Sequence, residues 1–343
     1  MKTLSILAFL LFLLSSGFSA RLGAVKLEKV LEFGSDDKRD YLFFGAGPIT
    51  SDHDGNIFVF DSGRCVIRKY NQKGVFVKEA GKKGQGPEEF LGVSGIVVWK
   101  DSLLIYDYIN KRLSQYDFDL EFIKSEKLNY AFSRGMECNQ DYLFFNRWIN
   151  LQGGLIMVPP FSEEKKLITP QHDFGNLKKF RTSPLFFAFF NYCFSVDPCS
   201  GGIVVTLSAP LTGEPELFSY NRKGELQSKI KMERIANYSF DERRVDLSRA
   251  GQVRGKGSFL VLIRAFHAAE NQVVFSYEYS GIIGNPETVE AGLLLVDTND
   301  GKILGRLKSK EYDIRCIQNG LAYGYIRDAE DAELKVGVYR IVL

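Results

Sequence analysis

A repeat at a spacing of 46 residues constrains the fold of this chain more than any other feature. The segment Ile57–Asp61 (IFVFD) returns as Leu103–Asp107 (LLIYD), and Tyr70 returns as Tyr116 at the same spacing. Strand-like repeats of roughly 40–50 residues, punctuated by Gly and Asp, are typical of β-propeller blades. We therefore expect an all-β fold of four-stranded blades.

The composition is that of a globular protein and argues against a general nucleic-acid binder. The chain has 343 residues, of which 45% are hydrophobic, enough apolar surface to build a core. Its 44 Lys and Arg nearly balance 42 Asp and Glu, for a formal net charge of +2. Proteins that grip nucleic acid usually carry a strong positive charge. We expect a small molecule, a glycan or another protein as the partner.

The N-terminus has the pattern of an export signal. Lys2 gives a basic start, an apolar run covers residues 4–14, and small residues follow. Gly17 and Ser19 favour cleavage after Ser19. The apolar run is shorter than the roughly 20 residues that span a bilayer, and no later segment is long and apolar enough to do so. We predict a signal peptide over residues 1–20, a single propeller domain over residues 21–343, and a periplasmic or extracellular location.

Turn residues place six blades along the chain. Asp54-Gly55-Asn56 predicts the first tight turn of blade one, and blade two follows from Ser94 to about Lys127. The turns of the other four blades fall at residues 139–141, 198–202, 269–271 and 319–320. The last blade lacks a fourth strand, and the strand-like segment Leu27–Phe33 can supply it. We predict a six-bladed propeller whose last blade is closed by the N-terminal strand, which hides an otherwise exposed edge.

Two motifs resemble those of NHL-type propellers. Asp107, Asn110 and Arg112 have the spacing of the NHL repeat, and blade one keeps Asp61 but has Arg64 in the position of the Asn. The loop 84–90 (GQGPEEF) is similar to the Gly-x-Gly-Pro-Gly-Glu-Phe loop of exported NHL-like six-bladed propellers, with a Glu replacing the third Gly. The resemblance covers about a quarter of the chain and implies a fold, while leaving the activity open.

These motif residues also have structural explanations, which we favour. Gly84 and Gly86 supply backbone geometry that other residues adopt poorly. Asp61 and Asp107 can accept N–H bonds from the loops that follow their strands. Asn110 can brace neighbouring blades.

Strand direction predicts which face of the propeller binds a ligand. Because strands alternate in direction within a blade, the loops between second and third strands open on the same face as the connections between blades. We call this the long-loop face, since irregular connections are expected there at residues 176–184, 232–257 and 279–291. Binding residues concentrate on such loops. The opposite face is expected to carry short hairpins.

Charged and polar side chains of the long-loop face are the candidate ligand contacts. The capping-box pattern at residues 239–242 predicts a short helix, and the arginines after it form either internal ion pairs, which we favour, or an anion-binding lid. The candidate ligand-binding residues are Asp61, Arg64, Lys82, Lys83, Asp107, Asn110, Arg112, Arg243 and Arg244. The apolar stretch Ser183–Phe190 is expected to form part of the inner strand of blade four, and otherwise a contact patch on the rim.

The sequence lacks a strong catalytic signature. The three histidines, His53, His172 and His267, divide between the two faces and are poorly placed to share a zinc ion. Of the five cysteines, Cys193 and Cys199 could close a small loop, although separate burial is the favoured alternative. We predict a non-catalytic binding scaffold without a cofactor. The alternative is a hydrolase or lyase that uses calcium or zinc at the channel mouth.

Overall fold

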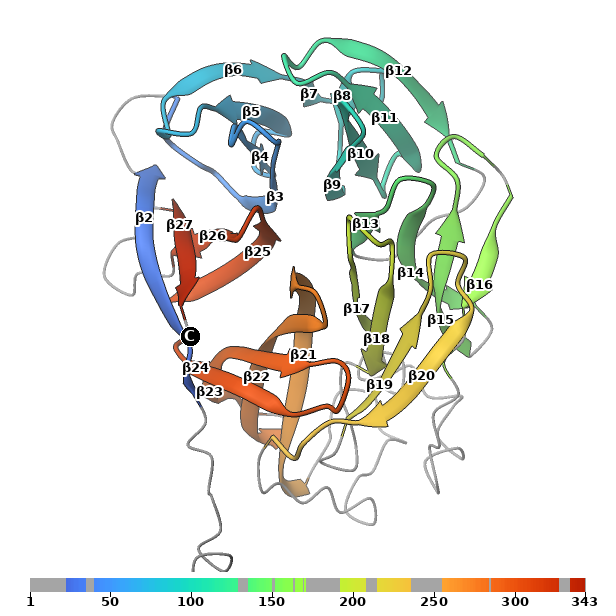
Figure 1. Ribbon diagram of the computed structural model, residues 1–343. Helices are drawn as coiled ribbons and strands as arrows, with labels where there is room; N and C mark the ends of the chain where they lie inside the picture. The colour runs from blue at the N-terminus through green and yellow to red at the C-terminus, as the bar shows by residue number, and fades with distance from the viewer. Residues whose placement is uncertain are drawn as a thin grey trace, which may run out of the picture.

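Six small β-sheets stand in a ring around a central axis in the computed structural model (Figure 1). The structure describes residues 23–34, 40–128, 135–149, 152–162, 164–168, 170, 192–207, 215–235, 255–283, 285–326 and 334–342. These residues include no helix, and therefore none that is long and apolar enough to cross a membrane. The prediction of an all-β, six-bladed propeller is confirmed.

The first three blades follow one another along the chain. Blade one consists of β3 (Ala46–Ser51), β4 (Ile57–Asp61), β5 (Val66–Tyr70) and β6 (Phe76–Ala80). A small parallel pair, β7 (Lys82–Lys83) and β8 (Glu89–Phe90), lies in the connection to blade two. Blade two consists of β9 (Val93–Trp99), β10 (Ser102–Asp107), β11 (Arg112–Tyr116) and β12 (Phe122–Lys127). Blade three consists of β13 (Met136–Cys138), β14 (Leu143–Ile149), β15 (Gln152–Val158) and β16 (Lys166–Ile168).

The last three blades complete the ring. Blade four consists of β17 (Tyr192–Val196), β18 (Ile203–Leu207), β19 (Glu216–Tyr220) and β20 (Leu226–Lys231). Blade five consists of β21 (Gly255–Ala269), β22 (Gln272–Ile283), β23 (Asn285–Asp297) and β24 (Ile303–Lys308), to which β1 (Gly23–Ala24) adds a parallel edge. Blade six consists of β25 (Tyr312–Gln318), β26 (Leu321–Ile326), β27 (Lys335–Val342) and β2 (Lys26–Gly34).

The repeated sequence marks the second strand of a blade. Every residue of β4 and β10 is buried, because these strands are covered by the neighbouring blades on both faces. A strand covered on both faces reads as a continuous apolar run rather than as an alternation. The strands IFVFD and LLIYD therefore stand out in the sequence, and their turns fall where the Gly and Asp residues predicted them.

The N-terminal strand closes blade six, as predicted. β2 pairs antiparallel with β27, with Leu27 opposite Ile341 and Phe33 opposite Val336. Phe33 is buried and its ring lies 4.6 Å from that of Tyr70 in blade one. This strand therefore fills the edge of the last blade and also packs against the first.

The inner strand of blade four includes β17 at Tyr192–Val196, and the stretch Ser183–Phe190, expected to contribute to it, lies outside the described residues. The structure corrects one expectation. The segment 279–291 is not an irregular loop, because β22 and β23 continue through most of it as one long hairpin. The predicted helix at residues 239–242 lies outside the described residues.

Candidate functional site

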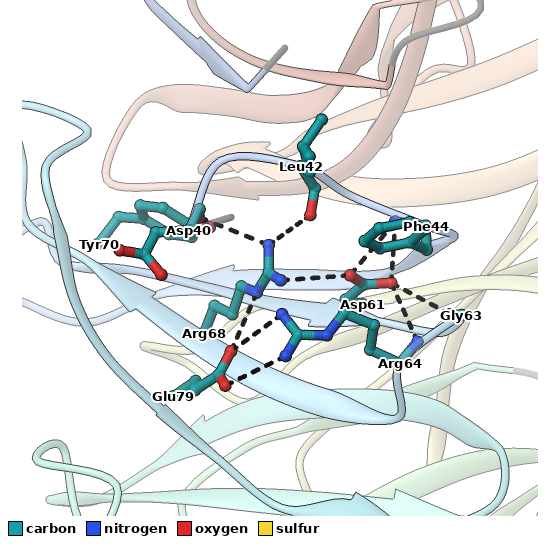
Figure 2. A network of polar contacts seen from close by, with 9 residues as sticks. All are labelled: Asp40, Leu42, Phe44, Asp61, Gly63, Arg64, Arg68, Tyr70 and Glu79. Atoms are coloured by element: carbon teal, nitrogen blue, oxygen red, sulfur yellow. Dashed lines mark hydrogen bonds and ion pairs between the residues drawn. The ribbon is translucent and has the colours of Figure 1, made fainter. Parts of the chain in front are cut away.

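Asp61 organises the long-loop face of blade one (Figure 2). Its carboxylate accepts N–H bonds from Phe44 at 3.1 Å, from Gly63 at 3.1 Å and from Arg64 at 3.3 Å. Phe44 belongs to the segment that enters the blade, whereas the other two residues follow Asp61 directly. One buried carboxylate thus fixes two loops that are far apart in the sequence.

Arg68 is the buried partner of Asp61, and the sequence analysis missed it. Its guanidinium lies 3.7 Å from the carboxylate of Asp61 and 3.4 Å from that of Glu79, and it donates to the Leu42 carbonyl at 2.6 Å. Arg64 pairs with the same Glu79 at 3.3 Å (Figure 2). The two arginines and two carboxylates balance to zero charge. We call Asp61, Arg64, Arg68 and Glu79 the blade-one charge cluster.

Asp107 repeats the role of Asp61 in blade two. It accepts N–H bonds from Leu91 at 2.7 Å and Gly92 at 3.2 Å, in the segment that enters the blade. It also accepts N–H bonds from Ile109 and Asn110, each at 3.0 Å, in the loop that follows. The same sequence position therefore does the same structural work in both blades.

Asn110 and Arg112 hold the Gly-rich loop between blades one and two. The amide of Asn110 donates to the Gly84 carbonyl at 3.0 Å, and Arg112 donates to the carbonyls of Gln85, at 2.7 Å, and Gly86. Arg112 is buried. The contacts of these two side chains are thus internal ones that fix the loop against blade two.

Lys82 and Lys83 are the candidate residues that stay exposed. Three quarters of the Lys82 side chain is accessible to water, although it pairs with Glu89 at 3.2 Å. Lys83 is also exposed on β7. The other candidates, Arg243 and Arg244, lie outside the described residues.

Three exposed apolar side chains, which the sequence analysis did not select, also lie on the long-loop face. The exposed fractions are 64% for Phe44, 47% for Tyr108 and 49% for Ile109. Each is held by one of the loops that Asp61 and Asp107 fix. Their position in the loops that Asp61 and Asp107 fix is the signal that could have identified them. We call Phe44, Tyr108 and Ile109 the apolar rim residues.

The histidines do not come together among the residues that can be described. His53 lies in the first hairpin turn of blade one, and His267 near the corresponding turn of blade five, 3.5 Å from a carboxylate oxygen of Asp197. His172 lies outside the described residues. Within the described ranges, no group of three or more His, Cys, Asp or Glu residues could hold a metal ion.

The cysteines divide between buried and exposed positions. Cys193 is buried, as favoured, whereas Cys199 is exposed, which corrects the expectation of separate burial for both. Both thiols are free in the structure. Cys199 belongs to the turn between the first two strands of blade four, on the face opposite the long-loop face.

Glu137 is an unusual carboxyl group on an inner strand. It lies on β13 and accepts the backbone N–H of Val196, in blade four, at 2.7 Å. Burial raises its pKa to about 8, against the single hydrogen bond that lowers it. The side chain is therefore largely protonated at neutral pH and able to donate a hydrogen bond.

Comparisons with known proteins agree with this fold. The family DUF5128, described as a 6-bladed beta-propeller, matches residues 45–156, about a third of the chain. No curated protein matches the sequence. A crystal structure of a DUF4221 family member from Bacteroides vulgatus has a TM-score of 0.63 and 11% identity, covering 94% of this chain and 99% of that one.

Two further solved structures are similar over nearly the whole chain. A protein of Bacteroides fragilis, described as a candidate exported protein, has a TM-score of 0.55 and 12% identity, covering 94% of this chain and 97% of that one. A luciferin-regenerating enzyme has a TM-score of 0.51 and 10% identity, covering 93% and 96%. At these identities the likeness shows the propeller fold and leaves the activity open.

Proposed function

We propose that this propeller is a non-catalytic binding protein that captures another protein with the long-loop face of blades one and two. The observation that carries the proposal is the exposure of the apolar rim residues on two adjacent blades. Large apolar side chains gathered on one face of a folded protein often mark an interaction surface. Aromatic residues in particular are enriched in protein interfaces.

The loops that carry these side chains are fixed before any partner arrives. Asp61 holds the loop of Phe44, and Asp107 holds the loop of Tyr108 and Ile109. A rigid binding surface loses little conformational entropy on association, so more of the contact energy appears as affinity. The buried candidates Asp61 and Asp107 therefore support binding indirectly, by fixing the loops. Lys82 and Lys83 are exposed and able to contact the partner.

The chemistry of the surface indicates what kind of partner fits. Apolar rim residues would contact an apolar patch, and the exposed ammonium groups of Lys82 and Lys83 would face carboxylates at its border. Charges at the border of an interface mainly steer association and set specificity. We therefore propose a partner that carries an apolar patch bordered by Asp or Glu.

Site-specific crosslinking tests this proposal. A photoreactive phenylalanine derivative placed at Tyr108 should crosslink a defined partner in the envelope fraction of the native cell. The same group at Val77, which is half exposed on the outer strand of blade one, is the matched control and should not crosslink it. With the purified partner, Phe44→Ser and Ile109→Ser should each weaken binding about tenfold, whereas Val77→Ser should not.

The controls separate loss of binding from loss of folding. Both rim substitutions replace exposed side chains, so the melting temperature should change little. Lys83→Glu should slow association, and the effect should shrink at high salt. Equal crosslinking from positions 108 and 77, or wild-type affinity in both the Phe44→Ser and the Ile109→Ser variants, would contradict the proposal.

We also propose that the protein is exported and that its motifs are of the NHL type. The leader pattern at residues 1–20, ahead of a propeller over residues 21–343, supports export, and one structural relative is described as a candidate exported protein. The Asp107 loop, with its Asn and Arg contacts, supports the NHL resemblance. N-terminal sequencing of the protein from its native cell should begin at Ala20, and an intact Met1 would contradict export by cleavage.

A further inference from the structure

Two arginines and one aspartate from neighbouring inner strands meet beside the axis of the ring. Arg264 lies on β21 of blade five, and Asp313 and Arg315 lie on β25 of blade six. Arg264 donates to the carboxylate of Asp313 at 2.8 Å and to the Ile314 carbonyl at 3.2 Å. Arg315 donates to the other oxygen of Asp313 at 2.6 Å. We call Arg264, Asp313 and Arg315 the axis cluster.

The position of the cluster follows from the strand order. β25 is the edge strand of its sheet and faces the axis of the ring (Figure 1). Asp313 is the second residue of β25, which begins where the chain leaves the connection between blades five and six. The axis cluster therefore lies toward the long-loop end of the ring.

Irregular strand pairing accompanies both arginines. The register of β25 with β26 shifts between Ile314 and Cys316, which leaves Arg315 without an opposite residue. A similar shift in β21 falls between Leu262 and Arg264. Bulges of this kind re-aim side chains and are frequent beside functional sites. The guanidinium of Arg315 lies 5.4 Å from the ring centre of Tyr325, a position that limits its movement.

The charges of the axis cluster do not balance. Among the described residues, Asp313 is the only carboxylate within ion-pair distance of either guanidinium. Two guanidinium groups and one carboxylate leave one positive charge, in contrast to the neutral blade-one charge cluster. The Nε atom of Arg315 is buried and has no hydrogen-bond partner among the described residues.

Electrostatics show the same excess of positive charge. Burial lowers the pKa of Arg264, and the neighbouring charge of Arg315 lowers it further. Burial alone would raise the pKa of Asp313, but Arg315 and Arg264 together hold it below its usual range. Asp313 therefore remains ionised, and its single negative charge is shared between two cations.

Solvent reaches this cluster although it lies on inner strands. The exposed fraction of the side chain is 32% for Arg264 and 19% for Arg315. An arginine pair that solvent could not reach would have a structural role only. Partial exposure allows an anion from solution to reach the two guanidinium groups.

We propose that Arg264 and Arg315 bind the carboxylate group of a small organic acid that enters from the long-loop face. A planar carboxylate matches the fork of a guanidinium and accepts paired hydrogen bonds from it. Its single negative charge cancels the excess charge of the cluster. A phosphate dianion would instead reverse the sign of the charge, so it should bind less well.

This site goes beyond the proposed function and is independent of it. The axis cluster is built from inner strands of blades five and six, whereas the apolar rim residues belong to loops of blades one and two. Capture of a protein partner can therefore fail while carboxylate binding holds, and the reverse is equally possible.

Acetate is the simplest probe, and Arg315→Gln is the first variant to test. Titration calorimetry and thermal melting, at constant ionic strength with chloride as the replaced anion, should show saturable binding of acetate to the wild-type protein and a rise in its melting temperature. Arg315→Gln and Arg264→Gln should each weaken acetate binding about tenfold. Arg315→Lys keeps the charge but loses the fork. Its affinity for acetate should lie between that of the wild type and that of Arg315→Gln.

The matched control is Arg222→Gln on the opposite face. Arg222 is exposed in the turn between β19 and β20 of blade four and pairs with Asp141 in the turn between β13 and β14 of blade three, so it belongs to different blades from the axis cluster. This variant should bind acetate as the wild type does. The proposal is overturned if acetate gives no saturable response, if inorganic phosphate binds as tightly, or if the folded Arg264 and Arg315 variants keep wild-type affinity.

Discussion

The blade-one charge cluster and the axis cluster contain the same chemical groups in opposite situations. In blade one, two arginines meet two carboxylates, and both Arg68 and Asp61 are fully buried. At the axis, two arginines share a single carboxylate and keep contact with water. The difference indicates different roles. A buried cluster with balanced charges fixes loops, whereas an accessible cluster with an excess positive charge is able to bind a ligand.

Breaking the blade-one charge cluster should give the largest effect on stability. Arg68→Gln leaves the carboxylates of Asp61 and Glu79 without their shared partner, and it also removes the donor to the Leu42 carbonyl. Removing one partner of a buried ion pair typically costs about 3–5 kcal/mol. Urea unfolding should show a loss in this range. A loss below about 1 kcal/mol, the level of a surface ion pair, would mean that the cluster does not hold the fold.

The second prediction distinguishes the structural role of Arg112 from the exposed position of Lys83. From the sequence, both residues were equal candidates for ligand contact. Arg112→Ala removes the donor to the Gln85 carbonyl and one of the two donors to the Gly86 carbonyl, which still accepts the N–H of Glu89. It should lower the free energy of unfolding by about 1–3 kcal/mol. Lys83→Ala removes an exposed side chain and should change it by less than about 0.5 kcal/mol. Equal effects in the same urea titration would contradict these different roles.

Glu137 tests whether ionising a buried carboxyl group on an inner strand costs stability when one backbone N–H is its hydrogen-bond donor among the described residues. Its pKa is raised to about 8 in the folded protein, so the folded state binds more protons than the unfolded state between the usual Glu pKa and that value. Stability should therefore be fully present below about pH 4 and fall as pH rises through 8. The fall should amount to about 1 kcal/mol or more, since one pKa unit corresponds to about 1.4 kcal/mol and solvent screening reduces the total.

Glu137→Gln is the matched variant for this pH dependence. Glutamine resembles the protonated acid in shape and carries no charge, so the variant should be more stable than the wild type at pH 9 and similar to it at pH 5. Urea titrations at the two pH values make the comparison. Parallel pH profiles for the two proteins would show that Glu137 ionises as easily as an exposed Glu.

A small effect on stability is expected from the axis cluster. Arg315→Gln relieves the repulsion between two guanidinium groups, and Asp313 keeps its bond to Arg264. The gain and the loss oppose each other, so the free energy of unfolding should change by no more than about 1 kcal/mol. A loss as large as that expected for Arg68→Gln would assign the axis cluster a structural role.

The fold could be predicted from the sequence because its signal is local. Blades one and two repeat short apolar runs that end in turn residues, and the turn at Asp54-Gly55-Asn56 lies between β3 and β4, as the pattern predicted. Closure by Leu27–Phe33 followed from the need to cover one edge. Blade five was predicted less well, because strand residues of the long hairpin were taken for an irregular loop.

The candidate site was predicted only in part, because its contacts are not local. Asp61 and Asp107 were recognised as loop-fixing residues from their spacing. Arg68 was missed because nothing in the strand VIRKY distinguishes a buried arginine from an exposed one. The axis cluster joins Arg264 to Asp313, 49 residues further along the chain, through bulges that leave no mark in a sequence pattern.

The most direct test measures stability and acetate binding on the same two variants. Arg68→Gln should lose about 3 kcal/mol or more of unfolding free energy, while the folded fraction keeps the full stabilisation by acetate. Arg315→Gln should keep its stability and lose most of the stabilisation by acetate. If both variants lose both properties to the same degree, or if the effects are exchanged, the division between a cluster that holds the fold and a cluster that binds a ligand is wrong.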